Sequence, residues 1–204
     1  MSSHGYTMIT VARCDAGYLS QALEHLGVLA EELKSQAGAA AARFGVISTG
    51  EHAGSLILFQ VYDELNGIDR AFDVYASSDT YKALVGSGKL DVSLRNIAKM
   101  EDLGLQNSSS ELPAYGVLTK WASPEPMTEK MAPLVHLFED NGAMIMRYGT
   151  LVTGTSVGRR LLGVGYPSMD AIEKTYEALR SSKEYTDILA DIDLEFRNIF
   201  RYVG

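Results

Sequence analysis

The alternation of hydrophobic and polar residues divides the first half of the chain into six elements. After a strand-like run over residues 6–13, apolar residues recur every three to four positions from Leu19 to Leu33, and this helical pattern ends at Gly38. Two strand-like runs then flank a glycine-containing turn. The predicted strands are residues 6–13, 39–49, 55–62 and 91–100, and the predicted helices are residues 19–37 and 65–85.

The second half of the chain repeats this pattern. Residues 38–50 and 142–154 both fit GA-x3-R-(F/Y)-G-x3-T-G at an offset of 104, and the alignment continues to Val85 with 13 identities in 48 positions. Background composition predicts roughly 3 identities over such a length. The chain therefore contains an internal duplication. The second copy predicts strands at residues 115–121, 143–153, 159–166 and 192–203 and helices at residues 128–141 and 169–190.

The order βαββαβ in each copy predicts an α+β protein made of two ferredoxin-like repeats. Right-handed crossovers place both helices of a repeat on one face of a four-stranded antiparallel sheet. The other face then needs a cover, so we expect the two sheets to pack face to face as a barrel within one chain. We assign residues 1–103 to the first repeat, 104–113 to an exposed polar linker, and 114–204 to the second repeat. A homodimer of such tandem chains is compatible with this arrangement and is not required by it.

Composition narrows the partners that the protein can have. The 204 residues carry a formal net charge of −8, which disfavours a nucleic-acid partner because phosphate binding needs basic residues. Apolar runs fall well short of the ~18–20 residues that span a bilayer, and the N-terminus lacks a signal-peptide pattern. We therefore expect a cytoplasmic protein with no membrane partner, in which the single Cys14 is a reduced thiol.

The repeats resemble a known superfamily. Three features together are similar to the dimeric α/β-barrel superfamily, which includes antibiotic-biosynthesis monooxygenase-like domains. They are the βαββαβ unit, the strand ending in Tyr62 or Tyr166, and the helix carrying Ser-Ser-x-x-Tyr at residues 77–81 and 181–185. The resemblance implies functions as varied as cofactor-free oxygenases, haem-degrading and haem-binding enzymes, lactone isomerases and stress-related proteins. Haem-degrading members have an Asn on the first strand and a His in the second helix. Here Thr10 and Thr119 occupy the first strands and the second helices contain no His.

No cofactor or metal is expected from the residues. His4, His25, His52 and His136 form no metal-ligand spacing, and there is no cysteine cluster. We interpret these histidines as solvated or locally bonded, with a base or axial ligand as the alternative. The string Gly163-Val164-Gly165 lies within a predicted strand, where small residues let another segment pack closely.

Strand arginines are the candidate ligand-binding residues. Arg43 and Arg147 share a sheet face with glycines two residues away, which leaves space beside a charge. Arg95 and Arg197 share the less apolar faces of the last strands, so we expect these faces to look into the barrel or its rim while the more apolar faces meet the helices. The arginines either pair with carboxylates such as Asp91, Asp193 and Glu195 or bind the carboxylate, enolate or phenolate of a small ligand. Tyrosine hydroxyls at the strand ends are further candidates for such a pocket, with packing as the alternative role, and these residues are Tyr6, Tyr62, Tyr115 and Tyr166.

Two functional hypotheses follow from these residues. In the first, the chain is a small-molecule-binding barrel that acts as a cofactor-independent monooxygenase-like or isomerase-like enzyme, with arginine or tyrosine stabilising an oxyanion. In the second, it is a non-catalytic stress-type or ligand-binding barrel. An open cavity with convergent polar groups supports the first, and a filled interior supports the second.

Overall fold

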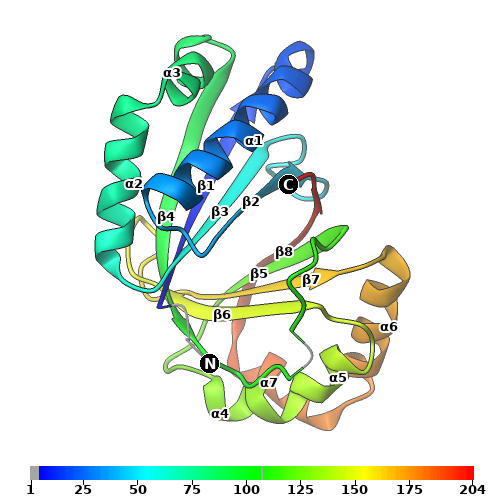
Figure 1. The fold of residues 1–204 in the computed structure, drawn as a ribbon. Coiled ribbons are helices and arrows are strands. Elements are labelled where there is room, and N and C mark those ends of the chain that lie inside the picture. Colours follow the sequence, from blue (N-terminus) through cyan, green and yellow to red (C-terminus); the bar gives the residue numbers. More distant parts are fainter. Residues whose placement is uncertain (1–4, 107) are drawn as a thin grey trace.

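The computed structural model describes residues 5–106 and 108–204 and contains both predicted repeats (Figure 1). The first repeat is built from four strands and three α-helices, and the second from four strands and four short α-helices. The elements of the first repeat are β1 (Tyr6–Cys14), α1 (Leu19–Gln36), β2 (Ala41–Ile47), β3 (Leu56–Tyr62), α2 (Leu65–Ser77), α3 (Asp79–Gly86) and β4 (Leu90–Glu101). Those of the second are β5 (Tyr115–Ala122), α4 (Thr128–Met131), α5 (Val135–Glu139), β6 (Ile145–Leu151), β7 (Arg160–Tyr166), α6 (Met169–Arg180), α7 (Lys183–Asp191) and β8 (Asp193–Tyr202).

Three helices predicted as continuous are interrupted. The second helix of each repeat breaks at the Ser-Ser-x-x-Tyr motif, where Ser78 and Ser182 are extended and their hydroxyls accept hydrogen bonds from the backbone N–H of Tyr81 and Tyr185. The duplicated motif is therefore a helix N-cap, which satisfies a backbone donor that the new helix leaves unpaired. In the second repeat, Pro133 lies in a 3-10 turn between α4 and α5.

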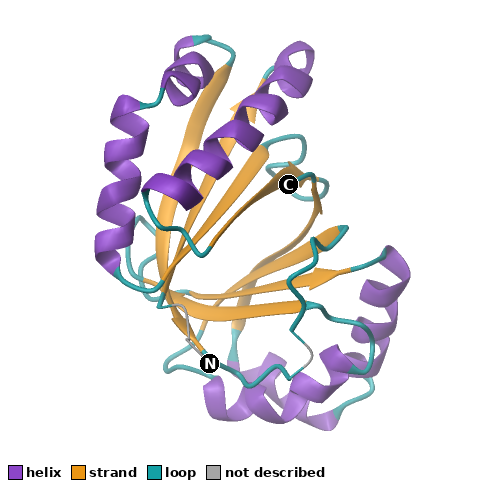
Figure 2. Ribbon diagram, in the orientation of Figure 1, coloured by secondary structure: helices purple, strands orange, loops and turns teal. Residues whose placement is uncertain are grey.

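The eight strands form one closed barrel in the order β1-β3-β2-β8-β5-β7-β6-β4. Each repeat contributes four neighbouring strands, and the two sheets join edge to edge where β2 pairs with β8 and β4 pairs with β6. The helices lie on the outside, one layer over each sheet (Figure 2). This confirms the predicted fold of two ferredoxin-like repeats in an intrachain barrel. No helix in the described part of the chain is long and apolar enough to cross a membrane.

The duplicated Thr-Gly motif fastens the two seams between the sheets. Thr49 accepts a hydrogen bond from the backbone N–H of Ile199 at 2.8 Å, and Thr153 accepts the equivalent bond from Ile97 at 2.8 Å. Gly45, on the strand before Thr49, lets β8 approach, because a Cβ there would lie 2.0 Å from the carbonyl oxygen of Arg201. The expected space beside Arg43 at this glycine is thus occupied by the neighbouring strand.

Large and small side chains from the two repeats interlock inside the barrel. Phe200 lies over Gly116, where a Cβ would be 2.1 Å from the ring, and its ring centroid lies 5.2 Å from that of Phe59. Each of these phenylalanines has a small residue at the equivalent position of the other repeat. Ala98 of the first repeat corresponds to Phe200, and Gly163 of the second repeat corresponds to Phe59. The interior therefore holds two of these aromatic rings where a symmetric duplication would hold four.

Candidate functional site

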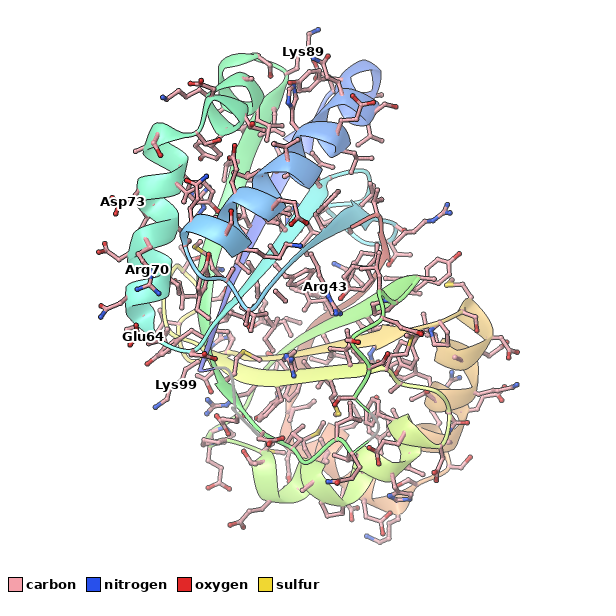
Figure 3. All side chains as sticks on the ribbon, viewed as in Figure 1. Arg43, Glu64, Arg70, Asp73, Lys89 and Lys99 are labelled. Atoms are coloured by element: carbon pink, nitrogen blue, oxygen red, sulfur yellow. The ribbon has the colours of Figure 1, made fainter. Side chains whose placement is uncertain are left out.

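A cavity opens at one end of the barrel between the two sheets. Its volume is about 110 Å³, and it is lined by residues of both repeats. Arg43 from β2 and Arg147 from β6 lie on its wall together with Tyr202 from β8, and we call this end the arginine mouth. Figure 3 shows the labelled Arg43 in the region between the sheets. The structure therefore brings together two of the four candidate arginines, one from each repeat.

Neither arginine of this mouth has an ion-pair partner among the described residues. A guanidinium nitrogen of Arg43 donates to the carbonyl oxygen of Ser110 at 3.3 Å, and Arg147 donates to its neighbour's carbonyl at 3.4 Å. Partial burial lowers the pKa of Arg147, and the charge of Arg43 lowers it further, while Asp102 acts in the opposite direction. The two positive charges are therefore neighbours that repel each other.

Tyr202 completes the polar part of the arginine mouth. Burial raises the pKa of its hydroxyl to about 12, and the charges of Arg43 and Arg147 oppose this rise. The side chain remains a neutral hydroxyl at pH 7, able to donate one hydrogen bond. Thr7 also lines the cavity, and its buried hydroxyl has no hydrogen-bond partner among the described residues.

The cavity is asymmetric because the repeats differ at two strand positions. Phe59 and Val61 on β3 project into the barrel, and their counterparts on β7 are Gly163 and Gly165. A Cβ on Gly163 would meet nothing closer than 3.8 Å, so this glycine borders open space. The missing side chain at Gly163 thus leaves space beside Arg147, whereas Pro113 fills the space at Gly165.

The linker between the repeats forms the outer wall of the arginine mouth. The backbone N–H of Ser109 donates to the carbonyl oxygen of Met144 at 2.8 Å. Pro113 packs on Gly165, where a Cβ would lie 2.6 Å from the proline ring. The prediction that another segment packs closely on the Gly163–Gly165 pair is correct at Gly165 and wrong at Gly163, where a Cβ would meet nothing closer than 3.8 Å. Most described residues of the linker are exposed, as expected, and Pro113 is buried because it packs on the end of the barrel.

Arg95 and Arg197 lie on the opposite side of the sheets from the prediction. Each guanidinium points away from the barrel into the helix layer, where Arg95 donates to Thr10 at 3.2 Å and to the Tyr81 hydroxyl at 3.1 Å. Arg197 donates to Thr119 at 3.3 Å and to the Tyr185 hydroxyl at 2.7 Å.

The expected carboxylate partners of these two arginines are replaced by tyrosines. The Arg95 guanidinium lies 4.5 Å from the centre of the Tyr75 ring, and the Arg197 guanidinium lies 4.3 Å from that of Tyr176. The more apolar faces of β4 and β8 instead line the barrel, where Leu94, Met100, Phe196 and Phe200 meet in one cluster. The assignment of faces on these strands was wrong because the barrel interior needs apolar residues and the helices supply tyrosines for the arginines.

Tyr62 and Tyr166 also lie outside the cavity. Both are fully buried between their sheet and its helices, and neither lines the arginine mouth. The Tyr62 hydroxyl donates to the side chain of Gln60 at 2.9 Å, and burial raises the pKa of both tyrosines. Their positions are those of packing residues.

Sequence reasoning missed several residues of the cavity wall. The apolar face of β8 that includes Phe200 was assigned to the helix side, and Tyr202, Thr7 and Phe59 carried no distinguishing pattern. The duplication contained one usable signal, since Phe59 aligns with Gly163 and so marks a place where the second repeat loses volume. That signal becomes interpretable only when the interior face is known.

The described residues form no metal site, and the cavities on the helix side of the sheets offer no histidine to a haem, whereas His52 borders a further cavity at the other end of the barrel. No three His, Cys, Asp or Glu side chains among them converge on a metal site. His25 and His136 lie on the outer helices, His52 lies in a turn, and His4 lies outside the described residues. The cavities between sheets and helices measure about 40 and 30 Å³, and the open groove beside α6 and α7 has no histidine in its lining. The haem chemistry of the superfamily therefore finds no histidine ligand at these places.

The fold is similar to that of several solved structures. Chlorite dismutase from Candidatus Nitrospira defluvii, solved in complex with imidazole, has 9% sequence identity and a TM-score of 0.66, with 100% of this chain and 93% of that chain covered. A protein assigned as a monooxygenase from Lactobacillus acidophilus NCFM has 12% identity and a TM-score of 0.63, with 98% and 94% covered. At these identities the likeness is one of fold, a duplicated ferredoxin-like barrel.

Sequence comparison gives a family without an assigned activity. None of the curated protein sequences matches the chain. The family model described as "Domain of unknown function (DUF6854)" matches residues 4–100 and 113–202, which together are most of the chain. The chain therefore belongs to the DUF6854 family.

Proposed function

We propose that this protein binds a small organic anion at the arginine mouth. The observation that carries the proposal is the pair of guanidinium groups, Arg43 and Arg147, which lie on one cavity wall without a carboxylate partner among the described residues. Two like charges in a partly buried site repel each other, and a bound anion would remove this cost. Arginine also offers a planar fork of donors that matches a carboxylate or an enolate.

The cavity limits the size of the anion. A volume of about 110 Å³ resembles apolar cavities that accept a single six-membered ring. Phe59, Ile145 and Phe200 provide apolar walls, and the charges lie at the open end. The ligand class that fits is a monocyclic or short-chain carboxylic acid, enol or phenol, with its anionic group at the mouth and its apolar part inside.

This arrangement supports a cofactor-independent monooxygenase-like or isomerase-like reaction. Such chemistry passes through an enolate or phenolate, which paired guanidinium groups and the neutral Tyr202 hydroxyl would stabilise more strongly than the neutral substrate. The apolar walls and the linker would limit access of water, which strengthens these interactions.

One observation favours the alternative of a non-catalytic binding barrel. The cavity wall contains no carboxylate and no imidazole among its described residues, so no general base lies within it. A binding protein needs only the arginines and the apolar walls. Turnover separates the alternatives, because an enzyme consumes an acid, enol or phenol that the binding protein releases unchanged.

The binding step can be tested by calorimetry with benzoate and 4-hydroxybenzoate. We expect binding by the wild type and a loss of about 10- to 100-fold in Arg43→Met and Arg147→Met, since a charged hydrogen bond contributes about 1.5–3 kcal/mol. Arg13→Met is the matched control, because Arg13 is exposed at the far end of β1. Unchanged benzoate affinity in both mouth variants would refute the proposal.

A second variant tests the cavity itself. Gly163→Phe introduces at β7 the residue that the first repeat carries at the same position, and it fills the space beside Arg147. We expect this variant to fold and to lose benzoate binding. Retained binding would place the ligand elsewhere.

A further inference from the structure

A second, larger cavity occupies the opposite end of the barrel. Its volume is about 580 Å³, within the range of ligand pockets. Four buried side chains border both cavities and separate them, and they are Ile9, Leu118, Leu161 and Phe200. The two cavities therefore open at opposite ends, and the second one has its own set of polar groups.

Two asparagines from equivalent positions of the repeats line this second cavity. Asn96 lies on β4 and Asn198 on β8, and we call this end the asparagine mouth. Each carboxamide packs against a turn glycine, and a Cβ on Gly50 would lie 2.1 Å from the Asn198 oxygen. Gly50 has φ of +85°, so the turn conformation and the close carboxamide both require glycine. The described residues give neither carboxamide a hydrogen-bond partner, which leaves their donors and acceptors for a ligand.

The basic residues at the asparagine mouth are already paired with Glu195. Lys120 binds Glu195 at 2.8 Å and the Ser156 hydroxyl at 3.1 Å, and Arg159 binds the other oxygen of Glu195. The side chains of the Lys120–Glu195 pair are partly buried, with exposed fractions of 18% for Lys120 and 26% for Glu195. The first repeat has Val11 and Ser93 at these positions, so the ion pair is specific to the second repeat.

We therefore expect the asparagine mouth to select its ligand by hydrogen bonding and not by net charge. Lys120 and Arg159 both bind Glu195, and Glu51 is the remaining charged carboxylate of the lining, whereas the two arginines of the arginine mouth have no ion-pair partner among the described residues. Below the polar rim the wall is apolar and includes the rings of Phe196 and Phe200. Planar amides above aromatic rings suit a molecule that has many hydroxyl groups and one apolar face.

We propose that the asparagine mouth is a second binding site, for an uncharged polyhydroxylated molecule of the size of a saccharide or an aryl glycoside. The hydroxyl groups are placed to exchange hydrogen bonds with Asn96, Asn198 and Ser156, and the apolar face is placed on Phe196. The proposal is independent of the anion site, because the four separating side chains divide the two cavities.

The experiment uses phenyl β-D-glucopyranoside as the probe and two-dimensional NMR of the full chain as the readout. We expect saturable shifts at about 10 mM probe or below, in amides of residues 50–52, 96, 155–156 and 198. Asn96→Ala/Asn198→Ala is expected to weaken binding at least about tenfold. Arg43→Met, at the other mouth, is expected to leave it unchanged.

A second variant separates loss of the site from loss of the fold. Thr155→Trp places a large ring at an exposed turn residue that lines the cavity, so it blocks the entrance without changing the strands. We expect it to abolish the shifts while its urea-unfolding curve matches the wild type. Three outcomes would each overturn the proposal. The wild type shows no saturable shifts, the probe still binds both Asn96→Ala/Asn198→Ala and Thr155→Trp, or Arg43→Met loses binding of the probe.

Discussion

Replacing Arg95 by Met tests the structural role that we assign to the arginines behind the sheets. Met keeps most of the apolar stem and removes the guanidinium. The lost interactions are two hydrogen bonds from a charged donor, to Thr10 at 3.2 Å and Tyr81 at 3.1 Å, and the contact with the Tyr75 ring at 4.5 Å. The site is half-buried, so we take the lower end of the usual range for each and expect a cost of about 2–4 kcal/mol.

The assay is urea unfolding followed by circular dichroism, with Arg43→Met as the matched control. Arg43 has one long hydrogen bond and a repelling neighbour, so its replacement is expected to change the free energy of unfolding by less than about 0.5 kcal/mol. A double-mutant cycle of Arg95→Met with Tyr81→Phe isolates the direct contact, for which we expect a coupling of about 1 kcal/mol or more.

Two outcomes would show that this reasoning is wrong. The first is an Arg95→Met variant as stable as the wild type within about 0.5 kcal/mol, which would mean that water replaces the tyrosine and threonine contacts without loss. The second is an Arg43→Met variant that is destabilised as strongly as Arg95→Met. The equivalent replacement of Arg197 repeats the test in the second repeat, because its contacts are the same in kind.

Three further predictions concern the barrel. Phe200→Ala removes a buried ring from the wall between the cavities and is expected to cost about 3–5 kcal/mol in urea unfolding, so a cost below 1 kcal/mol would contradict the packing described. Thr49→Ala leaves the Ile199 N–H without its acceptor and is expected to speed hydrogen exchange of that amide, whereas unchanged exchange would show that the seam does not depend on it. Hydrogen bonds from Lys120 and Arg159 lower the pKa of Glu195 below its ordinary value of 4.5, so the stabilisation that Glu195 provides is present above that pH and is lost as pH falls through the folded-state pKa. Glu195→Gln is expected to flatten the dependence of the free energy of unfolding on pH below pH 4.5. The same dependence in the variant and the wild type would refute the assignment.

The architecture was determined by local sequence patterns. Period-2 and 3.6-residue alternation specify strands and helices, and the 104-residue offset specifies that the βαββαβ order occurs twice. Two duplicated motifs, Thr-Gly and Ser-Ser-x-x-Tyr, were visible as repeats. The role of Thr49 at the seam depends on a partner from a distant strand, whereas the helix cap at Ser78 is a local contact with Tyr81. Arg43 and Arg147 could be nominated because they occupy equivalent positions on strands.

Only the tertiary structure decided which face of each strand looks into the barrel. Both faces of every sheet are covered here, one by helices and the other by the partner sheet, so the usual contrast between an apolar and a polar face is weak. On β4 the arginine face meets helix tyrosines, whereas on β2 the arginine face looks inward. The cavities were also beyond sequence reasoning, because a cavity is the volume that packed segments leave unfilled. Phe59 and Gly163 line the arginine mouth together although they belong to different repeats, and how such distant segments pack is not visible in the sequence.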